Sequence, residues 1–255
     1  MKISKFLTFS IVLSILVISI ATASLLIPAN DNAKENSQAA GNSPVIEETD
    51  SGGWELERVD FIHYVKPNSP AKASRTDSCY KLMGVKWRTT PLNYIINPSN
   101  PDSLSEGFVA SAISESAETW DSATSRELFN NTYKINYTAN YGNQDFNNVI
   151  DFGNLNDDRA IAVTTIWYTI VGKQIVEYDI RFNTQFKWGD ATINSSLMDL
   201  RNIAVHEKGH GFGLADIYST ACSEVTLYGY SNYGETKKRT LEQPDITGLQ
   251  KLYGI

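Results

Sequence analysis

Residues 206–216 read HEKGHGFGLAD, a segment in which two histidines, two carboxylates and a glycine have the spacing of a metal site. Residues four apart on an α-helix lie on the same face, so a helix here would direct His206 and His210 at one cation. Glu207 would lie to the side, where its carboxylate can reach a water on the metal without occupying a ligand position. We therefore predict a catalytic zinc ion with Glu207 as the general base.

The third ligand must come from beyond the helix. A straight helix would carry Asp216 roughly 9 Å past His210, too far to share a metal whose ligand bonds are about 2 Å. Gly213 can end the helix and turn the chain back, because a residue without Cβ adopts the left-handed conformation readily. We predict that His206, His210 and Asp216 hold the zinc.

Gly213 followed by Asp216 resembles the metzincin pattern HExxHxxGxxH/D, in the form with Asp as third ligand. Residues 225–230 (VTLYGY) and 241–254 (LEQPDITGLQKLYG) are similar to matrixins, where a tight turn carrying Met and Tyr follows the zinc helix and a C-terminal helix follows the turn. Tyr228 matches the Tyr, whereas Leu227 stands where the Met would be. The resemblance covers residues 80–255 and implies a zinc metalloendopeptidase that hydrolyses peptide bonds of protein or peptide substrates.

Other interpretations compete with this one. Glu224 or Glu235 could supply a third ligand in a thermolysin-like arrangement, and the histidines could be incidental to an amphipathic helix. The fold could also serve a non-proteolytic zinc hydrolase or a secreted binding protein without catalysis. The remaining histidine of the chain, His63, is expected outside the catalytic core.

The N-terminal third of the chain predicts export. Residues 1–23 combine two lysines, an apolar run and a small-x-small ending, which indicates a signal peptide cleaved after Ala23, with an uncleaved membrane anchor as the alternative. Residues 24–53 are polar and poor in large apolar side chains, as in a flexible linker. Residues 54–79 are either a pro-segment covering the cleft or an extra edge strand, and residues 80–255 form the catalytic domain. We expect a secreted protein that contacts a membrane only transiently through its signal peptide.

The patterns of the domain predict an α+β fold, a metzincin or zincin-like catalytic domain with a twisted mixed β-sheet, an N-terminal helix, an active-site zinc helix and a C-terminal helix. Ser103 and Glu106 have capping-box spacing before the first helix, and Ser196 and Asp199 have the same spacing before the zinc helix. Strand patterns occupy residues 92–96, 133–138, 148–152, 161–170 and 174–183. In matrixins a strand above the cleft binds the substrate peptide, a role that falls by order to residues 161–170, although a buried central strand fits equally well.

Two further features concern cysteines and charge. Cys79 and Cys222 are the only cysteines, and such a pair in an exported chain predicts a disulfide. The alternative, by resemblance, is a cysteine that binds the zinc in a latent form, but the sequence around Cys79 lacks the matrixin switch pattern. The net charge of −7 argues against nucleic acid as a partner, and we expect a monomer. The acidic loop 154–158 is either a calcium site or a solvated turn.

Overall fold

The computed structural model describes residues 55–67 and 78–255. The predicted signal peptide (1–23) and linker (24–53) lie outside the described residues, as do residues 54 and 68–77 of the segment 54–79. Among the described residues, no helix has both the length and the apolar character needed to cross a bilayer.

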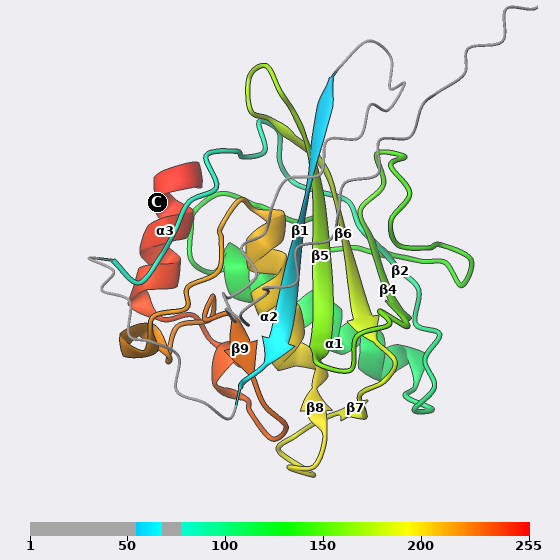
Figure 1. Cartoon of the computed structure of the whole chain (residues 1–255). Helices are drawn as coiled ribbons and strands as arrows, with labels where there is room; N and C mark the ends of the chain where they lie inside the picture. The colour runs from blue at the N-terminus through cyan, green and yellow to red at the C-terminus, as the bar shows by residue number, and fades with distance from the viewer. Residues whose placement is uncertain (1–54, 68–77) are drawn as a thin grey trace, which may run out of the picture. The chain divides into compact units, whose positions relative to one another are not determined.

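One seven-stranded sheet organises the described domain, with the strand order β3-β2-β4-β6-β5-β1-β9 (Figure 1). Its strands are β1 (Leu56–Val65), β2 (Ile95–Ile96), β3 (Lys134–Ile135), β4 (Val149–Gly153), β5 (Ala160–Thr169), β6 (Ile175–Asn183) and β9 (Tyr230–Ser231). β5 runs antiparallel to both of its neighbours, β6 and β1, and the other pairings are parallel. The predicted strands are therefore present, although those predicted at 92–96 and 133–138 are only two residues long, and the mixed sheet confirms the α+β class.

The helices are α1 (Glu106–Asp121), α2 (Leu200–Gly211) and α3 (Gln243–Tyr253), with a small two-stranded sheet of β7 (Trp188–Gly189) and β8 (Met198–Asp199) directly before α2. Figure 1 shows α1 and α2 side by side behind the long strands β1, β5 and β6. The core lies between these layers, and it buries Trp120 of α1 with Ile203 of α2 and Ile166 of β5. Burial of such large apolar side chains is the main favourable term in folding, and here it fixes α2 against the sheet.

Both predicted helix starts differ from those observed. α1 begins after Ser105, whose side chain accepts the Phe108 N–H, and not after Ser103. The Asn100 side chain accepts the Leu104 N–H and so closes a turn in which Ser103 is left-handed (φ 59°), which delays the helix by two residues. Local hydrogen bonding of an Asn side chain thus overrides the capping-box spacing at Ser103.

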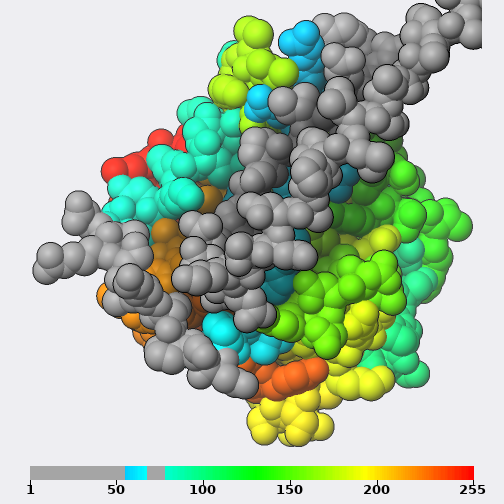
Figure 2. Space-filling view, viewed as in Figure 1, coloured from blue at the N-terminus to red at the C-terminus, as the bar shows by residue number. Residues whose placement is uncertain are grey.

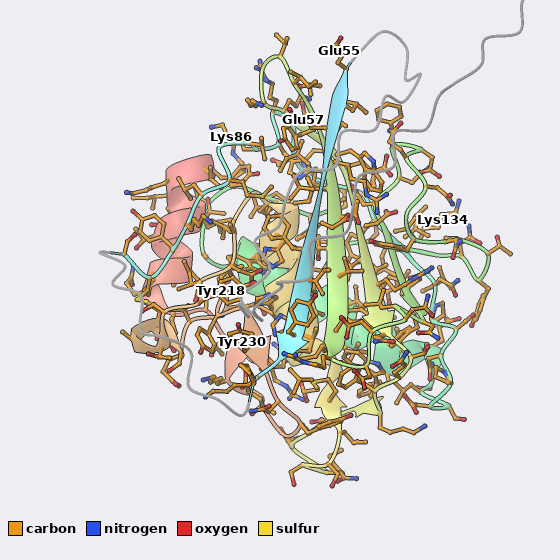
Figure 3. All side chains as sticks on the ribbon, in the orientation of Figure 1. Glu55, Glu57, Lys86, Lys134, Tyr218 and Tyr230 are labelled. Atoms are coloured by element: carbon orange, nitrogen blue, oxygen red, sulfur yellow. A yellow bond between two sulfur atoms is a disulfide. The ribbon has the colours of Figure 1, made fainter. Side chains whose placement is uncertain are left out.

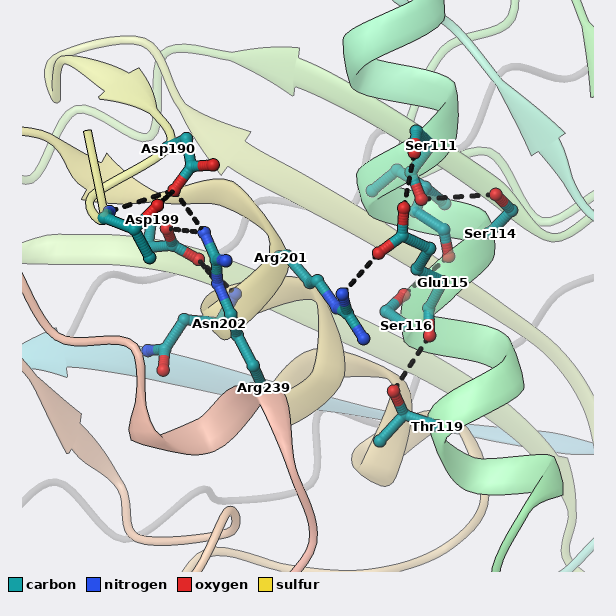
Figure 4. Close-up of polar contacts among 12 residues, drawn as sticks. Ser111, Ser114, Glu115, Ser116, Thr119, Asp190, Asp199, Arg201, Asn202 and Arg239 are labelled. Carbon is teal, nitrogen blue, oxygen red and sulfur yellow. Dashed lines mark hydrogen bonds and ion pairs between the residues drawn. The ribbon is translucent and has the colours of Figure 1, made fainter. Parts of the chain in front are cut away.

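α2 begins at Leu200 with Asp199 as its N-cap, and not at Ser196. Residues 198–199 are held extended by their pairing with β7, so the helix cannot start earlier. The Asp199 carboxylate accepts the Asn202 N–H and the Ala191 N–H, and it also pairs with the Arg239 guanidinium (Figure 4). The N-terminus of α2 is therefore tied to segments before and after it in the chain.

Cys79 and Cys222 form a disulfide, which confirms the predicted pair and leaves no free cysteine among the described residues. The chain between them also pairs locally, since the Met83 N–H donates to the Gly213 carbonyl and the Ala215 N–H donates to the Lys81 carbonyl. The loop that follows α2 is thus fastened to the segment 79–83 by covalent and backbone bonds.

Candidate metal centre

The predicted ligands His206, His210 and Asp216 converge in the described structure. The two Nε2 atoms lie 3.1 Å apart, and Asp216 Oδ1 lies 3.3 Å from His206 Nε2 and 3.5 Å from His210 Nε2. Three donors bound tetrahedrally at bond lengths of about 2.0–2.1 Å are separated by roughly 3.3 Å, so the spacing of these atoms fits one zinc ion. All three side chains are buried.

Hydrogen bonds on the far side of the two histidine rings direct their Nε2 atoms at one point. His206 Nδ1 lies 2.7 Å from the Thr226 carbonyl oxygen and His210 Nδ1 lies 2.9 Å from the Leu214 carbonyl oxygen. A carbonyl only accepts, so each Nδ1 carries the proton and each Nε2 presents a lone pair. Two lone pairs and a carboxylate oxygen therefore face one another in a buried space, an arrangement that repels unless a cation or a proton lies between them, and Asp216 accordingly raises the pKa of His210.

Protonation of this group follows the same logic. Burial, together with the nearby Lys238, lowers the pKa of His206 to about 3 although Asp216 opposes the shift. Burial alone would raise the pKa of Asp216, but the neighbouring His210 and His206 outweigh it and hold the pKa well below its usual value. A neutral imidazole and an ionised carboxylate are the forms that bind a metal.

The bend that brings Asp216 back depends on Gly213. Its φ is +94°, and a Cβ added there would lie 2.2 Å from the Val85 carbonyl oxygen. The sequence prediction of a left-handed glycine is therefore confirmed, and a second reason appears: the backbone of residue 85 occupies the space of a side chain. Beyond the bend, Tyr218 donates its hydroxyl to Asp216 Oδ2 at 3.1 Å, which leaves Oδ1 facing the histidines. Tyr218 lies next to Tyr230 of β9 (Figure 3), and the centroids of their rings are 5.2 Å apart.

The turn below the histidines is fixed by α3. Asp245 accepts the backbone N–H groups of Thr226 and Leu227 at 2.9 and 3.2 Å. The same Thr226 carbonyl holds His206, so α3 positions a ligand through the turn. Leu227, which replaces the expected Met, is buried, and its side chain lies directly under Gly209 of α2.

Glu207, the residue after His206 in α2, points toward strand β5 of the sheet. Its Oε2 accepts the Thr164 hydroxyl of β5 at 2.6 Å, and its Oε1 has no hydrogen-bond partner among the described residues. Burial raises the pKa of Glu207 to about 7. A buried carboxylate whose proton affinity lies near neutral pH, oriented by a hydroxyl, has the properties of a general base.

The expectation for His63 is wrong. We expected this residue outside the core, but it is fully buried at the site, with its ring 3.8 Å from the ring of His206 and its Nδ1 3.5 Å from Glu207 Oε1. Neither ring nitrogen of His63 has a hydrogen-bond partner within the described residues. Sequence distance misled the prediction, because β1 returns to the sheet as the neighbour of β5.

The remaining sequence candidates lie elsewhere. Glu224 is exposed and paired with Lys237, and Glu235 accepts a hydrogen bond from Ser231, so neither joins the groups of possible ligands in residues 55–67 and 78–255. In loop 154–158 the Asn154 and Asp157 side chains accept backbone N–H groups two residues ahead, as in a local turn. A calcium ion in that loop stays a prediction.

Sequence reasoning missed three positioning residues, Thr164, Tyr218 and Asp245. Thr164 and Tyr218 carry no spacing signal, because their contacts depend on sheet register and on the bend after α2. Asp245 could have been found, since it lies inside the C-terminal block of residues 241–254 that carried the family resemblance.

Comparisons with known proteins show the family of the chain. Neutrophil collagenase of Homo sapiens is 30% identical over 174 residues, which cover 67% of this chain and 34% of the relative. Matrix metalloproteinase-20 of Homo sapiens is 26% identical over 171 residues (66% of this chain, 32% of the relative), and matrix metalloproteinase-25 of Mus musculus is 26% identical over 184 residues (69% and 28%). The chain thus spans about a third of the length of the curated relatives it matches. The family model of the matrixins, peptidase family M10, matches residues 86–254, a range that contains all three helices and every strand except β1. This chain therefore belongs to the matrixin family.

Proposed function

We propose that the protein is a zinc-dependent metalloendopeptidase in which His206, His210 and Asp216 hold the metal and Glu207 is the general base. The observation that carries this proposal is the convergence of three donor atoms within 3.5 Å of one another, beside a carboxylate oxygen without a hydrogen-bond partner among the described residues. Membership of the matrixin family supports the same activity. When bound, zinc would polarise the substrate carbonyl and acidify a water.

The residues of the chain perform the proton transfers. Glu207 Oε1, which lacks a partner in the described structure, accepts a proton from the attacking water, and the same carboxyl then donates it to the amine that leaves. Thr164 holds the other carboxylate oxygen in place at 2.6 Å, so only Oε1 is available for this exchange. Atoms balance without a covalent enzyme intermediate, since water supplies the hydroxyl for one product and the proton for the other.

The base is tested by Glu207→Gln. This variant keeps the Thr164 contact and the side-chain volume but cannot accept the proton, so hydrolysis of casein should fall by about 100-fold or more while zinc stays bound. Zinc content is measured on the same preparation. An unchanged rate with full zinc content would rule out Glu207 as the base, and absence of hydrolysis from the unaltered protein with full zinc would favour a binding protein that keeps only the fold.

The third ligand is tested by a matched pair of carboxylate variants. Asp216→Ala should weaken zinc binding by more than about 100-fold, because it removes one of three direct donors and the loss of an outer-shell partner alone costs about 10- to 100-fold. Glu224→Ala removes the exposed carboxylate of the competing arrangement and should leave zinc binding unchanged. The reverse result would assign the site to the thermolysin-like geometry.

We propose further that the protein is exported and that residues 1–23 are removed. The Cys79–Cys222 disulfide supports export, since such bonds persist in oxidising compartments. Mass spectrometry of protein from the culture medium should find a chain that begins at Ser24; an intact N-terminus in the membrane fraction would instead indicate an anchor.

A further inference from the structure

A second concave site lies between the segment 82–88, the turn that joins β5 to β6, and the C-terminal turn of α3. It is a hollow of about 560 Å³, and no ligand or base of the candidate metal centre is among the described residues that line it. Figure 2 shows the segment in cyan at the upper left of the surface, between the lime β5–β6 turn and the red α3. The hollow is therefore a feature separate from the metal centre.

The lining of this hollow is basic. None of the ten described residues that line it is acidic, although acidic residues outnumber basic ones by 29 to 22 in the chain. Four of the ten carry a positive charge: Lys86, Arg88, Arg126 and Lys173. A concave surface lined by charges of one sign concentrates the electric field inside it and raises the local concentration of ions of the opposite sign. The hollow therefore favours an anionic ligand.

Two of these cations are oriented by neutral groups. Lys86 Nζ donates to the Leu252 carbonyl oxygen at 2.9 Å, and Arg88 Nη2 donates to the Gly172 carbonyl oxygen at 3.1 Å. A carbonyl carries no net charge, so these hydrogen bonds hold the ammonium and the guanidinium at the hollow without neutralising them.

The other two cations differ in their surroundings. The Arg126 side chain has no hydrogen-bond or ion-pair partner among the described residues. Lys173 has a carboxylate neighbour, Glu57, at 3.6 Å, but an exposed pair of this kind is worth only about 0–1 kcal/mol. Three of the four positive charges are thus left without a carboxylate in the described structure.

Backbone hydrogen bonds fix the walls of the hollow. The Lys86 N–H donates to the Lys173 carbonyl oxygen at 3.3 Å, and the Ile175 N–H donates to the Lys86 carbonyl oxygen at 3.0 Å. The Trp87 N–H donates to the Tyr253 hydroxyl of α3 at 3.1 Å. The segment is thus joined both to the β5–β6 turn and to α3, and a site that is formed in advance loses less entropy when a ligand binds.

The rest of the lining is mainly apolar. Leu82, Val85, Trp87 and Leu252 contribute to it, and a Cβ added at Gly84 would meet no atom within 4 Å, so the space above this glycine is open. The volume lies within the range of about 300–1,000 Å³ that is usual for small-molecule sites. Guanidinium groups match the geometry of phosphate oxygens, and the apolar part of the lining matches an apolar body attached to the phosphate.

We propose that this hollow is a second binding site, for a phosphate monoester on an apolar body, and that Lys86, Arg88 and Arg126 bind the phosphate. A phosphate monoester carries a charge of about −1.5 to −2 at pH 7, which suits several uncompensated cations better than the single charge of a carboxylate or a sulfate ester does. The inference goes beyond the proposed function, because no step of peptide hydrolysis involves this hollow.

The first experiment tests the ligand class by isothermal titration calorimetry of the full chain at about 0.15 M salt, where attraction between exposed charges is screened beyond about 8 Å. 1-Naphthyl phosphate should bind with a Kd below about 1 mM. Inorganic phosphate, which lacks the apolar body, and 1-naphthyl sulfate, which has the same body but one charge, should each bind at least about tenfold more weakly. Equal affinity for any two of these probes would overturn the proposed ligand, and no binding of 1-naphthyl phosphate would overturn the site.

The second experiment locates the site with a matched pair of arginine variants. Arg126→Ala removes a side chain without a partner in the described structure, so the fold should keep its thermal stability while 1-naphthyl phosphate binds at least about tenfold more weakly. Arg159→Ala removes the same charge from an exposed position outside the hollow and should change the affinity by less than about twofold. Equal weakening by both variants would show attraction by net charge alone and overturn the site. Unchanged binding in Arg126→Ala would also overturn it, because the ester would then bind elsewhere, for example at the metal.

A phosphate monoester on an apolar body is either a soluble molecule or the headgroup of a lipid, and vesicles distinguish these sources. The protein is sedimented with phosphatidylcholine vesicles that contain phosphatidic acid. Sedimentation that Arg126→Ala abolishes and Arg159→Ala keeps would support the site and assign it to a lipid, whereas binding of 1-naphthyl phosphate without sedimentation would support it and assign a soluble ester. Sedimentation that Arg126→Ala leaves unchanged, in a protein that does not bind 1-naphthyl phosphate, would overturn the proposal. None of these measurements uses hydrolysis, so a protein that never cleaves casein would refute the protease function and leave this test intact.

Discussion

Gly213→Ala tests the link between the bend after α2 and the metal. The substitution adds a Cβ that would lie 2.2 Å from the Val85 carbonyl oxygen, in a residue whose φ is +94°. The left-handed conformation costs an L-residue about 1–2 kcal/mol, and forcing extra volume into a packed site costs about 1–3 kcal/mol more. We therefore expect the free energy of unfolding to fall by about 2–5 kcal/mol.

A matched variant separates these two costs. Gly142 has nearly the same φ, +90°, but nothing lies within 4 Å of a Cβ added there. Gly142→Ala should therefore show only the conformational cost, about 1–2 kcal/mol. The difference between the two variants in urea-induced unfolding measures the contact with the Val85 carbonyl.

The same comparison has a readout at the metal. Relief of the contact in Gly213→Ala must move the chain that leads to Asp216, so zinc affinity should fall by about tenfold or more, whereas Gly142→Ala should bind zinc like the unaltered protein. Equal destabilisation of the two variants, together with equal zinc affinity, would refute the view that the bend is set by the segment at Val85.

Three other substitutions probe buried charge. Burial raises the pKa of Glu177 from 4.5 to about 8, so the folded state holds a proton that the unfolded state loses near pH 5. The free energy of unfolding should therefore decrease between about pH 5 and 8, with a slope of at most about 1.4 kcal/mol per pH unit. Glu177→Gln should flatten that slope in urea titrations, and an unchanged slope would refute this. Lys208 is fully buried among aromatic rings without a hydrogen-bond partner in the described structure, and burial lowers its pKa to about 7. Lys208→Met should therefore increase the free energy of unfolding by about 1–3 kcal/mol at pH 6 and by less at pH 9, where the lysine is already neutral. A loss of stability at pH 6 would contradict this. Asp245→Asn turns a carboxylate that accepts three backbone N–H groups into an amide. It should weaken zinc binding about tenfold, measured by competition with a chelator, because the Thr226 carbonyl that contacts His206 is held less firmly. Unchanged affinity would show that α3 does not position His206.

Most of the candidate site was predictable from the sequence because its main part is local. His206, Glu207 and His210 lie on one helix, and a periodicity of 3.6 residues determines their relative directions. Asp216 was predictable through Gly213, since a distance along the helix that is too long demands a turn. The α+β class and the strands followed from alternating and continuous apolar runs.

The rest depends on long-range pairing, which spacing does not encode. Nothing in residues 54–66 distinguishes a strand that borders β5 from a segment elsewhere, so His63 could not be placed at the site. The helix starts were missed for the opposite reason, because very local competitors decide them: an Asn100 turn before α1 and a strand pairing before α2. Capping-box spacing is a weak signal where such competitors exist.

The departure from the family pattern at Leu227 bears on whether catalysis is retained. A Cβ added at Gly209 would lie 2.7 Å from the Trp120 ring and 2.9 Å from a Leu227 methyl, so the turn and α1 pack directly on the helix between the two histidine ligands. What this position requires is an apolar side chain of the right volume beneath Gly209, and Leu and Met are close in volume. Neither residue donates to the metal in this arrangement, and the hydrogen bonds that hold the turn come from backbone atoms to Asp245. Leu227 therefore preserves the support of the histidines, and it gives no reason to expect a fold that has lost its chemistry.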